Sequence, residues 1–326
     1  MDTTRRPWRA LALMATLGLL IAACGGDDES EGDDGGAGAQ GGAFAELDLA
    51  GVSITVGSKD FTEQLVLGEM LVQAYEAAGA DVENRVNLGG TQVNRQALLE
   101  GEIDSYAEYN GTGWTEHLGN ETPSDDPETL TEAVREQDLA DNGIQWLGRS
   151  PFNNTYGFAT GPDLTEENGG AFDIDTMAAY LEDNPDSIVC MESEFPDRSD
   201  GLVLFEEATG FTIPQGQIDI LETNLIYTET ASRACDFGEI FTTDGRISEL
   251  DLSIVDDKGT FIIYNVSINV RDEVYQEKAE AFDAIAEGIL SDLDNDTMAG
   301  LNRRVSVDGE EPAAVALDYL TEKGLI

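Results

Sequence analysis

Apolar and polar residues follow a regular order in the first third of the folded part of the chain. Residues 52–56 (VSITV) alternate and are β-branched, which predicts a strand. Residues 82–88 and 103–107 predict two more strands. Between the strands, apolar residues recur at helical spacing over residues 65–79 and 91–101. Strand, helix, strand, helix and strand at this spacing predict a mostly parallel α/β sheet.

Polar loops follow the predicted strands. GSKDFTEQ (57–64) follows the first strand, and Thr91, the expected N-cap of the second helix, follows the second. Tyr109 and Thr112 come after the third strand. Ligands of open α/β sheets bind at the carboxyl ends of the strands. We therefore expect Lys59, Thr91 and Tyr109 to share one rim and to form half of a site.

The same pattern recurs in the second half of the chain. Residues 187–191 predict an apolar strand, and a polar loop rich in acidic residues follows at 192–200. Residues 238–247 again pass from an apolar stretch into a polar loop. A second sheet with a second rim is therefore expected.

Two extended segments, near 152–160 and 260–269, are predicted to cross between the sheets. The second lobe would then be an insertion in the first. Lobe one would comprise residues 50–155 and 265–326, and lobe two residues 156–264. Two rims that face each other across a two-strand hinge form a cleft that can close on a ligand.

The first 24 residues predict a targeting segment. Arg5, Arg6 and Arg9 precede the apolar run 11–23, which is too short to span a bilayer comfortably. The run ends in IAACG, which resembles the lipobox of bacterial lipoproteins and implies cleavage before Cys24 and lipidation of its sulfur. A plain signal anchor is the alternative, and export by the general or the twin-arginine route stays open.

A tether rich in glycine and acidic residues follows at 25–49. Its first part, GGDDESEGDDGGAGAQGG, has almost no apolar content and is expected to be disordered. Two further cysteines remain, Cys190 and Cys235. In an exported protein, a disulfide is the default for such a pair.

Charge and composition narrow the class of protein. The 326 residues include 17 basic and 66 acidic residues, a net charge of −49, which argues against a nucleic-acid binder. His117 is the only histidine, so Ser-His-Asp and zinc–histidine sites are not expected, and His117 is interpreted as a surface residue. No metal, cofactor or catalytic function is predicted.

Six motifs follow one another along the chain: VGSKDFTEQLVLGE, NLGGTQVNRQALLEGEIDSYAEYNGT, FNNTYGFA, ESEFPDRSDGL, FTTDGRI and DDKGTFIIYNV. Together they resemble one family, the substrate-binding lipoproteins of ABC importers for quaternary amines such as glycine betaine, choline and carnitine. The resemblance covers residues 52–326. It implies a two-lobed periplasmic-binding-protein fold of type II, osmoprotectant uptake at the outer face of the cytoplasmic membrane, and docking onto permease and ATPase subunits.

The resemblance also implies a binding site. A quaternary ammonium has no N–H to donate, so aromatic faces must hold it, at about 0.5–2 kcal/mol per cation–π contact. The family's cage corresponds to Tyr109, Tyr156 and Tyr264, with Phe241 as a fourth wall where relatives often carry tyrosine.

A betaine carboxylate needs donors as well. The matching motifs offer Arg198, Lys59 and Thr112, and arginine can bind a carboxylate with two N–H groups. Asn154 is expected to supply an amide contact. Lys59 and Arg198 together favour a ligand that bears a carboxylate over plain choline.

Three alternatives stay open. The ligand of such a binding protein could be another zwitterion, such as an amino acid. The chain could be an exported hydrolase on an α/β scaffold, although no nucleophile–base pair stands out in its sequence. It could also be a surface sensor or adhesin that keeps the fold.

Overall fold

The computed structural model describes residues 41–121 and 123–326. The predicted signal segment, the lipidation site at Cys24 and the tether up to residue 40 lie outside the described residues. Within the described part of the chain, no helix is both long and apolar enough to cross a bilayer.

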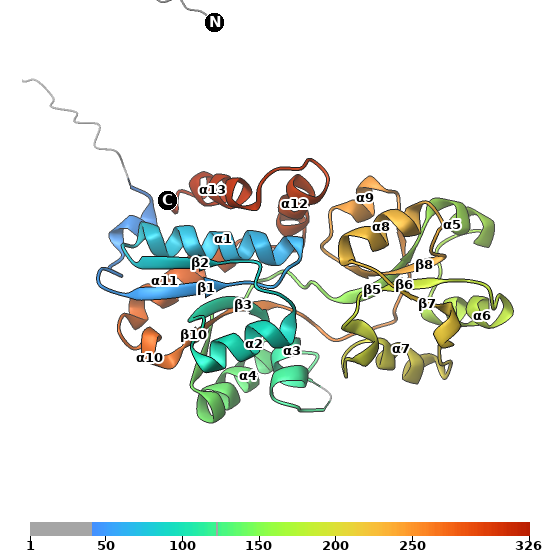
Figure 1. The fold of residues 1–326 in the computed structure, drawn as a ribbon, viewed down its shortest axis with the longest axis horizontal. Helices are drawn as coiled ribbons and strands as arrows, with labels where there is room; N and C mark the ends of the chain where they lie inside the picture. The colour runs from blue at the N-terminus through green and yellow to red at the C-terminus, as the bar shows by residue number, and fades with distance from the viewer. Residues whose placement is uncertain (1–40, 122) are drawn as a thin grey trace, which may run out of the picture. The chain divides into compact units, whose positions relative to one another are not determined.

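The first sheet has five strands in the order β2-β1-β3-β10-β4 (Figure 1). β1 is parallel to β2 and β3, whereas β10 is antiparallel to both of its neighbours, β3 and β4. The strands are β1 (Ser53–Gly57), β2 (Asp81–Arg85), β3 (Ser105–Tyr109), β4 (Ile144–Leu147) and β10 (Val266–Arg271).

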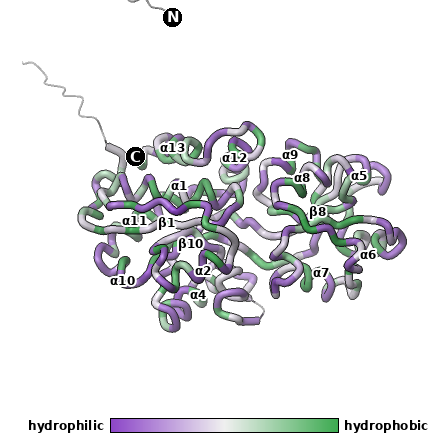
Figure 2. Tube along the Cα trace, in the orientation of Figure 1, coloured by the Kyte–Doolittle hydropathy of each residue, from purple (hydrophilic) through white to green (hydrophobic). Residues whose placement is uncertain are grey.

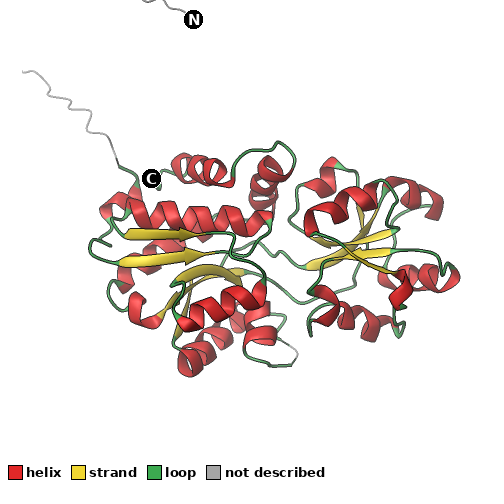
Figure 3. Cartoon of the chain, viewed as in Figure 1, coloured by secondary structure: helices red, strands yellow, loops and turns green. Residues whose placement is uncertain are grey.

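Helices cover this sheet on both faces (Figures 1 and 3). In both views α1 and α13 lie on one side of β1 to β3, and α2 and α4 lie on the other. The helical segments are η1 (Ala43–Glu46), α1 (Thr62–Ala77), α2 (Thr91–Glu100), α3 (Asn110–Thr112), η2 (Gly113–His117), α4 (Pro127–Asn142), α10 (Asp272–Tyr275), α11 (Ala279–Leu290), α12 (Asn295–Ser306) and α13 (Pro312–Glu322).

The second sheet also has five strands, in the order β7-β6-β8-β5-β9. Its strands are β5 (Tyr156–Thr160), β6 (Val189–Met191), β7 (Ile218–Ile220), β8 (Phe237–Phe241) and β9 (Ser253–Ile254). Its helical segments are α5 (Pro162–Asn168), α6 (Ile174–Asp183), η3 (Phe195–Asp197), α7 (Leu202–Thr209), η4 (Gln215–Gln217), α8 (Thr223–Ala231) and α9 (Arg246–Glu249).

The chain passes between the two sheets twice, over residues 148–155 and 255–265. β5 and β10, the strands that follow these passages, are antiparallel to their neighbours. The reason is geometric, because a chain that arrives at the carboxyl-end rim of a parallel sheet must run away from that rim. The predicted fold class, an α/β fold with two lobes and an inserted second lobe, is confirmed.

Buried apolar side chains pack both sheets against their helices. Every residue of β8 except its last is buried, Phe237 and Ile240 among them, and Figure 2 shows green apolar segments among the strands of the second sheet. Phe158 of β5 packs edge-to-face against Phe205 of α7, with ring centroids 5.3 Å apart. In the first sheet, Trp146 is fully buried and its indole N–H donates to Asp138.

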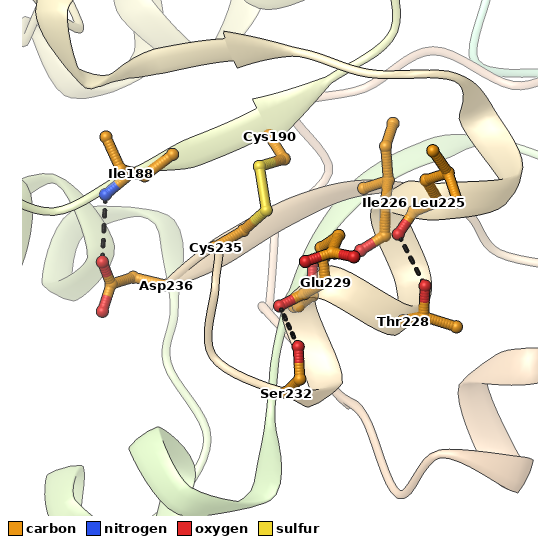
Figure 4. The surroundings of a disulfide bond; sticks show 10 residues. Ile188, Cys190, Leu225, Ile226, Thr228, Glu229, Ser232, Cys235 and Asp236 are labelled. Carbon is orange, nitrogen blue, oxygen red and sulfur yellow. Dashed lines mark hydrogen bonds between the residues drawn. A yellow bond between two sulfur atoms is a disulfide. The ribbon is translucent and has the colours of Figure 1, made fainter.

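A disulfide joins Cys190 of β6 to Cys235, just before β8, with their Cα atoms 5.7 Å apart (Figure 4). β6 and β8 are parallel neighbours, so the bond ties two strands whose carboxyl ends lead toward the second rim. Ile226 of α8 is buried beside it.

Four details differ from the sequence-based expectations. The tether was predicted to extend to residue 49, but residues 41–49 are part of the folded structure. The Phe44 side chain is buried in the core, and its backbone N–H donates to the carbonyl of Leu325. The third strand lies two residues later than predicted, so Tyr109 ends the strand. Gly90, and not Thr91, is the N-cap of α2. His117 has a fully buried side chain.

Candidate functional site

A cavity of about 520 Å³ lies between segments of both sheets. Its lining comes from the carboxyl ends of β1, β3, β6, β7 and β8 and from the amino ends of β5 and β10. These are the ends that the topology directs toward the rims. Seven of the eight predicted ligand-binding residues line it: Lys59, Tyr109, Thr112, Asn154, Tyr156, Phe241 and Tyr264.

Five aromatic rings form a closed circuit in the cavity wall: Phe61, Tyr109, Tyr264, Tyr156 and Phe241. Consecutive centroids around the circuit are 6.3, 6.2, 5.4, 5.3 and 5.0 Å apart. Burial raises the pKa of each of the three tyrosines well above 10, so all three phenols remain protonated near neutral pH.

The size of this aromatic circuit suits a compact cation. Adjacent ring centroids are only 5.0–6.3 Å apart, so a small cation that contacts one ring can also lie within the roughly 6 Å range of cation–π attraction of a neighbouring ring. The faces of aromatic rings carry the negative end of their quadrupole and can therefore stabilise a positive charge without hydrogen bonds.

Glu63, at the start of α1, is almost completely buried behind the circuit. One of its oxygens accepts hydrogen bonds from the Tyr109 hydroxyl at 2.8 Å and from Asn154 Nδ2 at 2.9 Å. The other accepts from the Thr243 hydroxyl at 2.5 Å and from Asn302 Nδ2 at 2.9 Å. One carboxylate thus joins a cage residue to the first crossing segment, to the loop after β8 and to α12.

Lys59 borders the cavity but is already paired. Its ammonium lies 2.7 Å from Glu108 Oε1 and 5.0 Å from the centre of the Tyr109 ring. The other Glu108 oxygen is 2.9 Å from both the Tyr106 hydroxyl and His117 Nε2. This buried cluster explains why the surface interpretation of His117 is wrong: the histidine has a carboxylate partner inside the protein.

Arg198 does not line the cavity itself and lies just behind its wall. Its guanidinium forms a two-point ion pair with Asp200, at 2.7 and 2.8 Å. Nη1 and Nη2 lie 3.3 Å from the hydroxyls of Thr91 and Thr112. The guanidinium carbon is also 5.5 Å from the Tyr156 ring centre. The arginine therefore lies beside the circuit with its charge balanced by an internal carboxylate.

Acidic side chains also border the cavity, and one of them lies near Arg198. Glu192 and Glu194, which follow β6, both line the cavity. Glu239 Oε2 accepts a 2.8 Å hydrogen bond from the backbone N–H of Glu192. Burial, together with the neighbouring Glu192, raises the pKa of Glu239 well above 4.5. Burial likewise raises the pKa of Glu192.

Sequence reasoning missed Phe61, Glu63 and Glu194. The first two lie within the motif that supplied Lys59, and Phe61 is the same residue type as the chosen cage residue Phe241. Glu194 lies four residues before Arg198 in its motif. Among residues 41–121 and 123–326, no group of three His, Cys, Asp or Glu side chains is arranged to hold a metal ion.

Comparison with known proteins relates this geometry to a family. The family model described as the substrate binding domain of ABC-type glycine betaine transport systems, OpuAC, matches residues 52–322. A glycine-betaine-binding protein of Pseudomonas aeruginosa is 32% identical, over 87% of this chain and 92% of that protein.

Two further comparisons agree with this match. The ergothioneine transport permease/ergothioneine binding protein EgtU of Helicobacter pylori is 31% identical, over 83% of this chain and 48% of that protein. The structure of apo YehZ from Escherichia coli is 30% identical, with a TM-score of 0.60 over 84% of this chain and 99% of that one. The chain therefore belongs to the OpuAC family of substrate-binding domains of ABC-type glycine betaine transport systems.

Proposed function

We propose that this protein is the extracytoplasmic binding component of an ABC importer and that it encloses glycine betaine or a related quaternary amine between its two lobes. The single observation that carries the proposal is the closed circuit of five aromatic rings in the cavity wall. Family membership supports the transport role. For the lobes we propose the bounds 50–155 with 265–326, and 156–264.

Each predicted site residue has a role in this proposal. Tyr109, Tyr156, Tyr264 and Phe241 surround the methylated nitrogen, and Phe61 completes the cage. Desolvated cation–π contacts are worth about 0.5–2 kcal/mol each, so several of them suffice for specific binding. The polar end of the ligand would lie toward the side chains whose donors border the cage: Lys59, Thr112, Asn154 and Arg198.

Contacts between the rims support a closing cleft. The Thr115 hydroxyl donates to Asp200 Oδ2 at 2.9 Å, and the Ser199 hydroxyl donates to Glu116 Oε1 at 2.6 Å. These bonds join the segment after β3 to the loop after β6. A ligand that contacts both rims would favour the closed arrangement by its differential affinity.

We further propose that the mature chain starts at Cys24 and is anchored by lipid at the outer face of the cytoplasmic membrane. There it would deliver the amine to permease and ATPase subunits for osmoprotection. The signal-like N-terminus and the polar tether support this placement. The proposal includes no chemical transformation of the ligand, and the only histidine, His117, is engaged with Glu108.

A calorimetric titration of the purified chain with glycine betaine, choline, carnitine and proline tests the proposal. We expect saturable binding of at least one quaternary amine and much weaker binding of proline. Binding heat seen only with proline or another amino acid would favour the alternative that the ligand is a zwitterion without a quaternary nitrogen. No binding of any quaternary amine would contradict the proposal.

One observation favours a second candidate ligand. A cavity of about 520 Å³ is within the range of sites for drug-sized molecules, about 300–1,000 Å³, and is roomy for glycine betaine. Ergothioneine is a larger betaine with the same trimethylammonium group, and the Helicobacter pylori relative is named for it. The titration therefore includes ergothioneine, and binding tighter than that of glycine betaine would favour this candidate.

A further inference from the structure

The place expected to receive a ligand carboxylate already holds one from the protein. Glu194 Oε1 accepts a 3.0 Å hydrogen bond from the backbone N–H of Thr91, the first residue of α2. Glu194 Oε2 lies 3.6 Å from Arg198 Nη1. A helix N-terminus and an arginine are the donors that a carboxylate prefers. Here Glu194, from the loop that also carries Arg198, accepts from the N-terminus of α2 in the other rim and lies near the guanidinium.

The backbone is shaped to admit this side chain. A Cβ atom on Gly90 would lie only 2.1 Å from Glu194 Oε1, so the approach requires glycine at position 90. The Glu194 backbone N–H donates to Glu192 Oε2 at 2.7 Å, which fixes the start of the loop. The contacts of Glu194 therefore place its side chain at a defined position in the cavity wall.

The charges around the cavity lead to a prediction about specificity. The Lys59 ammonium is balanced by Glu108, and the Arg198 guanidinium by Asp200. A ligand carboxylate at these donors would lie beside the carboxylate of Glu194, whose side chain is 35% exposed, and like charges brought together repel. A ligand hydroxyl has no such conflict, because it can donate a hydrogen bond to Glu194.

We propose that Glu194 is a specificity-determining residue that favours quaternary amines ending in a hydroxyl, the choline class, over those ending in a carboxylate. The inference rests on the proposed function, because it presupposes that the aromatic cage holds the methylated nitrogen. It names the preferred chemical class of ligand for that site and is opposite to the expectation that Lys59 and Arg198 favour a carboxylate.

The experiment compares dissociation constants of choline and glycine betaine for the wild-type chain and for Glu194→Gln. Glutamine keeps an oxygen that can accept from Thr91 but removes the charge. Glu207→Gln is the matched control, because Glu207 is exposed on α7 and does not line the cavity. Tetramethylammonium, which has neither a hydroxyl nor a carboxylate, reports on the cage alone.

We expect Glu194→Gln to shift the ratio of the two constants toward glycine betaine by about tenfold or more. Glu207→Gln should leave the ratio within about twofold, because the charge it removes is exposed to solvent outside the cavity. An unchanged ratio in Glu194→Gln, or a shift toward choline, would overturn the inference even if all variants bind tetramethylammonium. Failure of the wild-type chain to bind any of the three amines would instead contradict the proposed function.

Discussion

The hydroxyl of Tyr109 donates a 2.8 Å hydrogen bond to the buried carboxylate of Glu63. The same oxygen accepts from Asn154, and its partner oxygen accepts from Thr243 and Asn302. The cage is therefore positioned from behind by a group that does not line the cavity. The hydrogen-bond donors to Glu63 lie up to 239 residues away in sequence. Glu63 therefore connects the cage to distant parts of the fold.

We predict that Glu63→Gln lowers both stability and ligand affinity. In the wild-type chain all four donors face an oxygen of Glu63. The amide of glutamine places an NH₂ group against two of them, and each buried unsatisfied group costs about 1–3 kcal/mol. Thermal or urea unfolding should show a loss of about 2–4 kcal/mol. Affinity for tetramethylammonium should also fall, because one of the two oxygens that position Tyr109, Asn154, Thr243 and Asn302 is replaced by an NH₂ group.

Glu69→Gln is the control for this variant. Glu69 lies on the same helix and accepts a hydrogen bond from Asn84 at an exposed position. It should change the free energy of unfolding by less than about 0.5 kcal/mol. Equal free energies of unfolding for the two variants would show that the hydrogen bonds to Glu63 contribute little to stability.

The ion pair between Lys59 and Glu108 should make the stability of the fold depend on pH. Burial raises the pKa of Glu108, but the Lys59 ammonium and His117 outweigh burial and hold the pKa well below its ordinary 4.5. A carboxyl with a lowered pKa contributes stability above the unfolded-state pKa, and this contribution is lost as the pH falls toward the folded-state pKa.

In Glu108→Gln, the buried Lys59 loses its partner. Breaking a buried ion pair costs about 3–5 kcal/mol, so this variant should be much less stable than the wild-type chain at pH 7. The difference in unfolding free energy should shrink as the pH falls below about 4.5. A difference that stayed constant between pH 7 and pH 3 would mean that Glu108 is not the titrating group.

Some of this architecture was predictable from sequence, and some was not. Alternating apolar residues located β1 and β2, and the order of polar loops placed Lys59 and Tyr109 on one rim. Those patterns are local, with periods of two or 3.6 residues, so one segment is enough to reveal them.

The unpredicted features are side-chain pairings that only the folded chain brings together. The sequence around His117 gives no sign that its partner is Glu108, nine residues earlier on β3. A glutamate in the first turn of a helix is ordinary, so Glu63 gave no signal of its four donors. Likewise, only the folded chain brings Glu194 to the N-terminus of α2.

Phe61 was missed although its motif was identified. Its ring stacks on Phe241 at 5.0 Å and on Tyr109 at 6.3 Å between centroids. We predict that Phe61→Leu weakens binding of tetramethylammonium by about three- to tenfold, the equivalent of one cation–π contact. Phe61→Tyr should stay within about threefold of the wild-type chain. Equal affinities of the leucine variant and the wild-type chain would exclude Phe61 from the cage.

The disulfide between Cys190 and Cys235 should stabilise the second lobe. The sequence separation of 45 residues corresponds to about 4 kcal/mol in the chain-entropy account. We predict that the double variant Cys190→Ala, Cys235→Ala unfolds at a markedly lower temperature, and that a reductant lowers the wild-type midpoint toward the same value. Unchanged midpoints in both experiments would show that the bond contributes nothing to stability.

The central claim is that aromatic faces hold a methylated nitrogen, and Tyr156 tests it most directly because its ring contacts both Tyr264 and Phe241. Titration calorimetry with tetramethylammonium should compare the wild-type chain, Tyr156→Phe and Tyr156→Leu. We predict that phenylalanine preserves the dissociation constant within about threefold, whereas leucine raises it about tenfold or more. Equal binding by the leucine variant and the wild-type chain would contradict the account.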